Sequence, residues 1–302
     1  MTALKNLFNK HFIALAVVVG LLSACGGDKK DDDKEDLVEA PDTVKAAVLN
    51  VGGELFSIPS PIQTALLIQK SGITYDKAVL SEANKVNSYS TDFARAMNLG
   101  IYGADLGYVS LYNQTQDALG YLASIKQLTD KLGISAAFDG PTMDRIKNNI
   151  TNKDSMMVLV GIAYRGSDAY LKTNQRTDIS SLILAGGWLE SMHFSVMAHK
   201  NKPSDQIRFR IAEQKQALTS LIKILGSNDG AQFAELATQM KDLATVYDGI
   251  QFKYVYVEPT TDTVKKVTYI NSTTEVTVTD EQLNQISTKI EEIRKKLVNT
   301  QS

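Results

Sequence analysis

Three acidic residues lie inside otherwise apolar, small-residue stretches that the sequence predicts to be helical: Asp105, Asp168 and Glu190. Paired carboxylates can act as general acid and base, and a nearby arginine or histidine can orient a bound group. If the helices pack together, these side chains converge on one candidate binding site, which comprises Asp105, Tyr108, Arg165, Asp168, Glu190 and His193. The alternative is structural: each acid is solvated at a rim, or is satisfied inside the core by a tyrosine hydroxyl or by Arg165.

Other residue patterns give catalysis little support. Only His193 and His199 follow the first 24 residues, and a spacing of six does not place them on one helix face. The chain has no H-E-x-x-H motif, no cysteine cluster and no G-x-S-x-G elbow. We therefore expect no metal site and no cofactor, and we favour a binding protein over an enzyme.

Cys25 is the only cysteine in the chain and closes the run Leu22-Ser23-Ala24-Cys25. Basic residues and then an apolar stretch, Phe12–Leu22, precede it. This stretch has about 11 residues, whereas a membrane-spanning helix needs roughly 20. The pattern is typical of a lipoprotein signal peptide over residues 1–24, with cleavage before Cys25 and lipidation, including palmitate, on its sulfur. The membrane is then a partner of the chain through this lipid.

An acidic, polar segment follows Cys25, and it contains the run from Asp28 to Asp36. Gly26–Asp36 has no apolar residue to bury, and Pro41 and Gly52-Gly53 follow, so we predict a disordered tether over residues 25–53. The remaining domain, residues 54–302, is nearly neutral, because residues 1–36 hold five of the 32 basic and six of the 34 acidic side chains and leave 27 basic against 28 acidic in the rest of the chain. Nothing in this charge balance favours nucleic acid as a partner.

The folded part is predicted to be mainly α, a multi-helix bundle in a single domain with a small β-hairpin or meander before the last helix. Caps and apolar periodicity predict the helix boundaries. The expected helices are 61–71, 91–112, 116–131, 142–149, 155–172, 176–199, 205–225, 230–247 and 281–298. Asp154 is the expected cap of the fifth helix, and Thr279 with Gln282 forms a capping box before the last.

Alternating aromatic and β-branched residues predict strands in two segments, 251–257 and 265–279, with a turn at 258–262. A third short strand at 275–279 is an option. The expected role of this insert is a cap over the helical core, and a projecting binding finger is the alternative. Small residues at four-residue spacing, among them Gly100 and Gly187, predict a close crossing of two central helices.

Several strings together resemble a family of outer-membrane lipoproteins of the Bacteroidetes that has no assigned function. They are Ser57–Pro61, Asn98–Tyr108, Asp168–Leu171 and Leu184–Trp188. The resemblance implies a helical fold and an envelope location, but no activity. The acidic run after Cys25 is similar to the signal that exports such lipoproteins to the outer face of the outer membrane. Three tripeptides resemble an envelope O-glycosylation motif, with Thr43, Ser155 and Thr263 as acceptors.

These observations predict a lipid-anchored lipoprotein of the outer membrane, exposed on the cell surface, that binds an envelope partner protein or a ligand through its helical body. Two alternatives remain open. One is an envelope enzyme that uses Asp105, Asp168 and Glu190, and the other is a purely structural or assembly-accessory lipoprotein.

Overall fold

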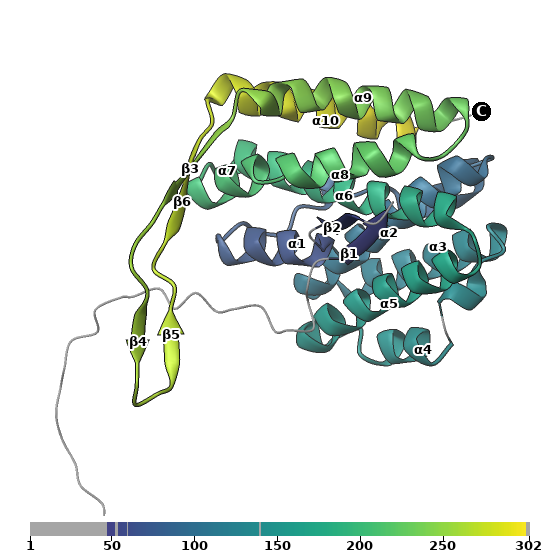
Figure 1. The fold of residues 1–302 in the computed structure, drawn as a ribbon. Coiled ribbons are helices and arrows are strands. Elements are labelled where there is room, and N and C mark those ends of the chain that lie inside the picture. Colours follow the sequence, from purple (N-terminus) through teal and green to yellow (C-terminus); the bar gives the residue numbers. More distant parts are fainter. Residues whose placement is uncertain (1–46, 52–53, 59, 139, 300–302) are drawn as a thin grey trace, which may run out of the picture. The chain divides into compact units, whose positions relative to one another are not determined.

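The computed structural model describes residues 47–51, 54–58, 60–138 and 140–299, which all lie in one compact unit. Within this part the chain forms ten α-helices, and a long β-hairpin precedes the last one (Figure 1). The mainly α prediction is therefore confirmed. The helices are α1 (Pro61–Lys70), α2 (Asp92–Leu111), α3 (Thr115–Lys131), α4 (Gly140–Asn148), α5 (Lys153–Thr173), α6 (Thr177–Asn201), α7 (Asp205–Ala212), α8 (Lys215–Gly226), α9 (Ala231–Asp248) and α10 (Asp280–Val298).

The shorter elements are three 3₁₀ turns and three two-stranded antiparallel pairs. The 3₁₀ turns are η2 (Lys77–Val79), η3 (Ala83–Ser88) and η4 (Ser135–Ala137), and the strands are β1 (Ala47–Val51), β2 (Glu54–Ile58), β3 (Gln251–Val255), β4 (Thr260–Asp262), β5 (Val267–Tyr269) and β6 (Thr273–Thr277). β1 lies inside the predicted tether, so disorder is the wrong expectation for residues 47–51. Its pairing with β2 supplies backbone hydrogen bonds that composition does not reveal.

Helix α6 lies at the centre of the bundle and packs against α1, α2, α5, α7, α8 and α10. Figure 1 shows α9 and α10 side by side beyond α8. Buried residues occur on every side of α6, as expected for a helix surrounded by others. The apolar seam of α10 faces this core, because Leu283, Ile286, Ile290 and Ile293 are all buried.

The close crossing predicted from small residues occurs between α2 and α6. A Cβ atom on Gly100 would lie 2.0 Å from the Ile183 carbonyl oxygen, and one on Gly186 would lie 2.1 Å from the Met97 carbonyl oxygen. Both distances are far inside van der Waals contact, so only glycine permits this approach. The crossing brings the backbones of α2 and α6 together, and with them the side chains that follow on each helix.

Caps explain most of the helix boundaries. At α10, the N–H of Gln282 donates to Thr279 Oγ1 at 3.1 Å, and the N–H of Thr279 donates to Gln282 Oε1 at 2.8 Å, which is the predicted capping box. At α5, however, the cap is Asn152, whose side chain accepts a hydrogen bond from the N–H of Ser155. The prediction of Asp154 as cap is wrong by two residues, because the asparagine carbonyl reaches that donor first.

The helix predicted over 205–225 is divided into α7 and α8. The break falls at Glu213 and Gln214. The buried side chain of Gln214 donates to the carbonyl oxygen of Arg210 at 3.3 Å and accepts from the Trp188 indole N–H at 3.1 Å. This amide binds a carbonyl that would otherwise accept from the helix backbone, so the packing of Trp188 and the interruption coincide.

The β insert forms one interrupted hairpin, which we call the arm (residues 251–277). β3 pairs with β6 at its base, and β4 pairs with β5 nearer the turn at 263–266. The predicted turn at 258–262 is therefore too early. The predicted strand 265–279 is divided into β5 and β6, and the optional third strand at 275–279 overlaps β6. Most side chains of the arm are exposed, and Figure 1 shows it extending away from the helices. The expectation of a cap over the core is wrong.

Candidate functional site

The crossing of α2 and α6 brings two of the predicted acids together. Asp105 on α2 and Glu190 on α6 are both completely buried, with 0% of their surface exposed. Asp105 lies five residues after Gly100, and Glu190 lies four residues after Gly186, so each acid is about one helical turn beyond the close contact. The sequence prediction that these two carboxyl groups meet is confirmed.

A cation that the sequence analysis did not single out completes the cluster. Arg294 on α10 donates from Nε to Glu190 Oε2 and from Nη2 to Glu190 Oε1, each at 2.6 Å. This is a two-pronged arginine–carboxylate pair, the geometry with the strongest charge-assisted hydrogen bonds. Burial alone would lower the pKa of Arg294, but the Glu190 carboxylate outweighs it and raises that pKa. Arg294 is therefore charged at any physiological pH.

The same guanidinium also holds the loop between η2 and η3. Its Nη2 donates to Ser81 Oγ at 2.8 Å and to the Val79 carbonyl oxygen at 3.2 Å. His193 on α6 contacts the same Val79 oxygen through Nε2 at 3.1 Å, so its Nε2 carries the proton. Burial lowers the pKa of His193, which keeps the ring neutral. The cluster thus joins α2, α6, α10 and this loop through one connected network.

Asp105 is the unusual member of the network. Neither of its carboxyl oxygens has a well-formed hydrogen-bond donor, although the Glu190 carboxyl and the Ser81 backbone lie against it. Burial raises the pKa of Asp105 well above its ordinary value, and repulsion from the Glu190 carboxylate raises it further. The raised pKa favours the neutral, protonated form of Asp105 beside the Glu190 carboxylate. One negative and one positive charge then remain in the cluster.

Tyrosines bound the cluster on one side. The Tyr121 hydroxyl donates to the Ser81 carbonyl oxygen at 2.5 Å, and the Tyr102 hydroxyl donates to the Glu82 carbonyl oxygen at 2.8 Å. Burial raises the pKa of both phenols, so they act as neutral donors. Both hydroxyls donate to backbone carbonyl oxygens of the loop that also accepts hydrogen bonds from Arg294. The cluster therefore has a structural role, because it fixes this loop against the helices.

The other predicted site residues do not join this cluster. Asp168 pairs with Lys172 at 2.7 Å and accepts a hydrogen bond from Ser180 on α6. Ser180 precedes Glu190 by ten residues, which is about 15 Å along a helix. The convergence of Asp168 with the other two acids is therefore wrong, because its position on α5 faces the opposite end of α6.

Tyr108 and Arg165 are also placed elsewhere. Tyr108 stacks against Phe194, with ring centroids 4.8 Å apart, and its hydroxyl accepts from the Asp76 N–H at 3.2 Å. Arg165 lies on an exposed face of α5. Of the six predicted residues, only Asp105, Glu190 and His193 belong to one cluster. Both carboxyl groups of that cluster are fully buried.

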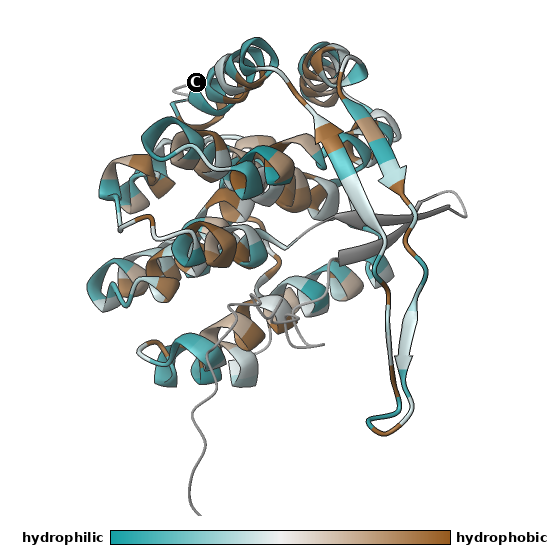
Figure 2. Cartoon of the chain, turned by 90° about the vertical axis from the view of Figure 1, so that its left-hand side faces the viewer, coloured by the Kyte–Doolittle hydropathy of each residue, from teal (hydrophilic) through white to brown (hydrophobic). Residues whose placement is uncertain are grey.

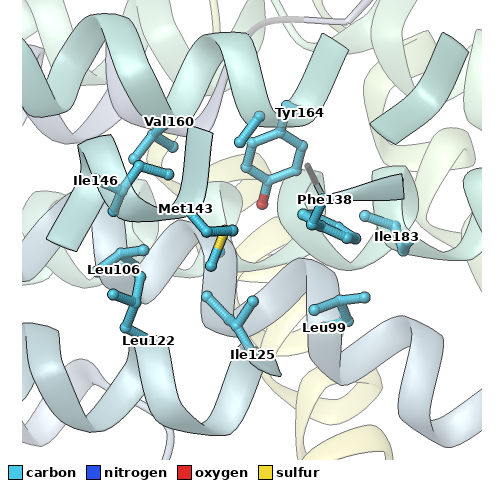
Figure 3. Close-up of a pocket in the computed structure, with 12 residues that line it drawn as sticks. Leu99, Leu106, Leu122, Ile125, Phe138, Met143, Ile146, Val160, Tyr164 and Ile183 are labelled. Carbon is cyan, nitrogen blue, oxygen red and sulfur yellow. The ribbon is translucent and has the colours of Figure 1, made fainter. Parts of the chain in front are cut away.

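A separate apolar pocket is lined by residues of α2, α3, α4, α5 and α6 (Figure 3). Its interior volume is about 40 Å³. Figure 3 shows side chains from several helices converging on this space, and Tyr164 supplies its one hydroxyl, which donates to the Gly100 carbonyl oxygen at 2.9 Å. The lining residues are Leu99, Gly103, Leu106, Leu122, Ile125, Phe138, Met143, Ile146, Val160, Ala163, Tyr164 and Ile183.

A wider groove adjoins this pocket between α3 and α4. Its volume is about 560 Å³, and it shares four lining residues with the pocket: Leu122, Ile125, Phe138 and Met143. Polar side chains form its rim, namely Lys126, Thr129, Asp130, Ser135, Asp144 and Lys147. A small apolar pocket and a wider groove with polar lining residues are therefore adjacent, and the sequence pattern alone did not indicate either.

Arg294 could have been noticed from the sequence. It lies four residues after Ile290 and three before Leu297, so it shares the buried seam of α10. A charged residue on an apolar seam indicates a buried partner.

Among the described residues, no group of histidine, cysteine and acidic side chains could hold a metal ion, and no helix has the length and hydropathy needed to cross a membrane. Comparison with family models, with curated proteins and with solved structures finds no match for this chain.

Proposed function

We propose that this chain is a lipid-anchored lipoprotein of the bacterial outer membrane, exposed on the cell surface, that binds an apolar ligand through its helical body and does not catalyse a reaction. The single observation that carries the binding function is the apolar pocket that shares four lining residues with the α3–α4 groove. Ligand sites are typically concave and mostly apolar, with a few polar groups that orient the ligand.

The geometry favours a ligand with a narrow aliphatic chain and a polar head. A pocket of about 40 Å³ admits the end of a chain but not a ring, because an apolar cavity that holds benzene is roughly 150 Å³. The groove has room for the rest of the molecule, and Lys147 and Lys126 at its rim can contact an anionic head group. Lys126 also pairs with Asp130 at 2.8 Å, so this contact would exchange one partner for another.

Binding of a dansyl-labelled fatty acid tests this proposal. Ala163→Leu fills the pocket from α5 and should weaken binding about tenfold or more, whereas Ala169→Leu places the same side chain on an exposed position of the same helix. Equal thermal stability of the two variants shows that the fold is intact. Absence of binding to the unmodified protein, or equal binding by both variants, would refute the ligand function.

The anchor is proposed from Cys25, which lies outside the described residues. Metabolic labelling with palmitate should mark the wild-type protein and not Cys25→Ser. Protease accessibility on intact cells tests the proposed surface location. If the label is incorporated while the protein stays protected, the anchor stands and the surface location falls.

O-glycosylation is a further part of the proposal. Thr263 is exposed in the turn of the arm, where Asp262 accepts hydrogen bonds from the N–H groups of Val264 and Lys265. Ser155 lies in the first turn of α5, and its N–H is already bound to the Asn152 cap. Thr43 is outside the described residues. Intact mass measurement should show added sugar, with Thr263 the best exposed acceptor of the described pair, and a mass equal to polypeptide plus lipid would exclude it.

A further inference from the structure

The arm (residues 251–277) exposes an unusual amount of aromatic and aliphatic surface. Tyr254 is 64% exposed, Tyr256 is 67% exposed and Ile270 is 71% exposed. Figure 2 shows hydrophobic residues recurring along the arm as far as its turn. A two-stranded hairpin is only marginally stable by itself in water. A projecting hairpin with such a surface indicates a contact with something outside the chain.

The aromatic residues at the base share one face. Side chains alternate along a strand, so Phe252 and Tyr254 of β3 point to the same side, with Tyr256 in continuation. Lys253 lies on the opposite face, where it pairs with its cross-strand partner Glu275 at 3.3 Å. The base of the arm thus has one aromatic face and one charged face. A contact that buries apolar surface would use the aromatic face.

The edges of the arm do not favour the addition of another strand. Pro259 lies between β3 and β4 and has no N–H to donate to a neighbouring strand. Proline and charged side chains on an edge are features that oppose strand-to-strand association. The exposed apolar side chains, and not the backbone, are therefore the contact surface.

The turn combines an apolar side chain with positive charge. Val264 is 91% exposed at the turn, and Lys265 and Lys266 follow it directly. The one acid in the turn, Asp262, is engaged by the two backbone N–H groups and lies 3.8 Å from Lys265. An exposed aliphatic side chain beside two lysines complements a surface that is negatively charged outside and apolar beneath.

We propose that the arm of the chain without sugar on Thr263 docks on an anionic lipid surface, with Val264 entering the interface and Lys265 and Lys266 contacting phosphate groups. A glycan on Thr263, next to Val264, would oppose this docking, because a sugar is bulky and polar. Basic residues near an anionic membrane attract it electrostatically, and tyrosine rings prefer the boundary between water and hydrocarbon. This inference rests on the proposed lipid anchor, which would keep the arm close to a bilayer. The anchor is also the reason to favour a lipid surface over a protein partner.

Vesicle binding by the chain from Gly26 onward tests the inference without the lipid on Cys25. This chain keeps every residue that the structure describes. It should sediment with phosphatidylglycerol vesicles and much less with phosphatidylcholine vesicles. Val264→Ser should weaken binding about tenfold and Val264→Phe should strengthen it, because the energetics follow the apolar area that enters the interface. Misfolding would not weaken binding in one variant and strengthen it in the other, so opposite changes report on the side chain itself.

Two further measurements sharpen the result. Lys265→Glu with Lys266→Glu should weaken binding to the anionic vesicles more than tenfold. Val264→Trp should show a blue shift of its emission when vesicles are added, against the constant signal of the buried Trp188. Vesicle binding that is absent, or that is equal in all these variants, would overturn the inference. Arm-dependent dimers without vesicle binding would overturn it in favour of a second copy. Because the lipid-free chain is used, these outcomes do not depend on whether Cys25 is acylated.

Discussion

The guanidinium of Arg294 donates two hydrogen bonds of 2.6 Å to the carboxylate of Glu190, and the two residues are 104 positions apart in the chain. The Glu190 side chain is completely buried and the Arg294 side chain is 13% exposed. This pair connects the last helix to the centre of the bundle.

Removal of one partner should therefore be costly. Arg294→Ala leaves the Glu190 charge buried without compensation, and we expect the free energy of unfolding to fall by about 3–5 kcal/mol. Replacing both residues, with Glu190→Leu and Arg294→Met, should recover much of this loss. Urea denaturation measures both. The exposed Lys126→Ala is the control and should leave stability essentially unchanged. A double variant no better than the single one would contradict this account.

Asp105 should make the protein less stable as the pH rises. Its pKa is raised in the folded state above the ordinary value of 3.8, so between these two values the folded state holds a proton that the unfolded state has lost. Stability is then fully present below 3.8 and declines as the pH rises toward the folded pKa. Asp105→Asn, which has nearly the same shape and is neutral at every pH, should abolish this decline and match or exceed the wild type at neutral pH.

Denaturation across a pH series checks the sign. Asp117 provides the opposite case, because hydrogen bonds from Lys77 and Tyr75 lower its pKa. The wild type gains stability from Asp117 as the pH rises from the lowered folded pKa to 3.8 and keeps it above 3.8, so Asp117→Asn should remove that gain. If both variants change the profile in the same direction, the proton on Asp105 is wrongly assigned.

His193 should make the protein less stable as the pH falls below 6.5. Burial lowers its pKa from the ordinary value of 6.5, so the unfolded state takes up a proton before the folded state does. Stability contributed by the neutral ring is present above 6.5 and is lost as the pH falls through that value toward the folded pKa. His193→Gln should flatten this part of the profile. His199, whose pKa burial also lowers, retains its share in that variant, so a residual slope is expected.

The glycines of the central crossing should differ sharply from one another. Gly100→Ala places a methyl group 2.0 Å from the Ile183 carbonyl oxygen, and separating the helices should cost about 3 kcal/mol or more. Gly107→Ala on the same helix places it 3.7 Å from the Ile62 side chain, an ordinary contact. Alanine also favours the helix by about 1 kcal/mol over glycine, so Gly107→Ala should be neutral or stabilising. Thermal unfolding of both variants measures this difference. Equal destabilisation by the two substitutions would contradict a steric effect specific to the close crossing at Gly100.

Local features of this chain were predictable from sequence because their causes lie within a few residues. The capping box at Thr279 and the buried seam of α10 depend on side chains three or four positions apart. The small residues of α2 and α6 predicted a close crossing because only glycine lacks the Cβ that would prevent it. The break between α7 and α8 was missed, since it depends on Gln214 meeting Trp188 from another helix.

The candidate site divides in the same way. The sequence alone determined that Asp105 and Glu190 lie on apolar helices, where a carboxyl group requires a partner. It also determined that the only thiol, Cys25, lies before the folded part. Only the tertiary structure decided that Arg294 is that partner and that a pocket adjoins the α3–α4 groove. It also decided that Asp168 on α5 meets Ser180, which is about 15 Å along α6 from Glu190. Helix periodicity determines which face a side chain occupies, but which faces meet depends on how whole helices pack, and no local pattern carries that information.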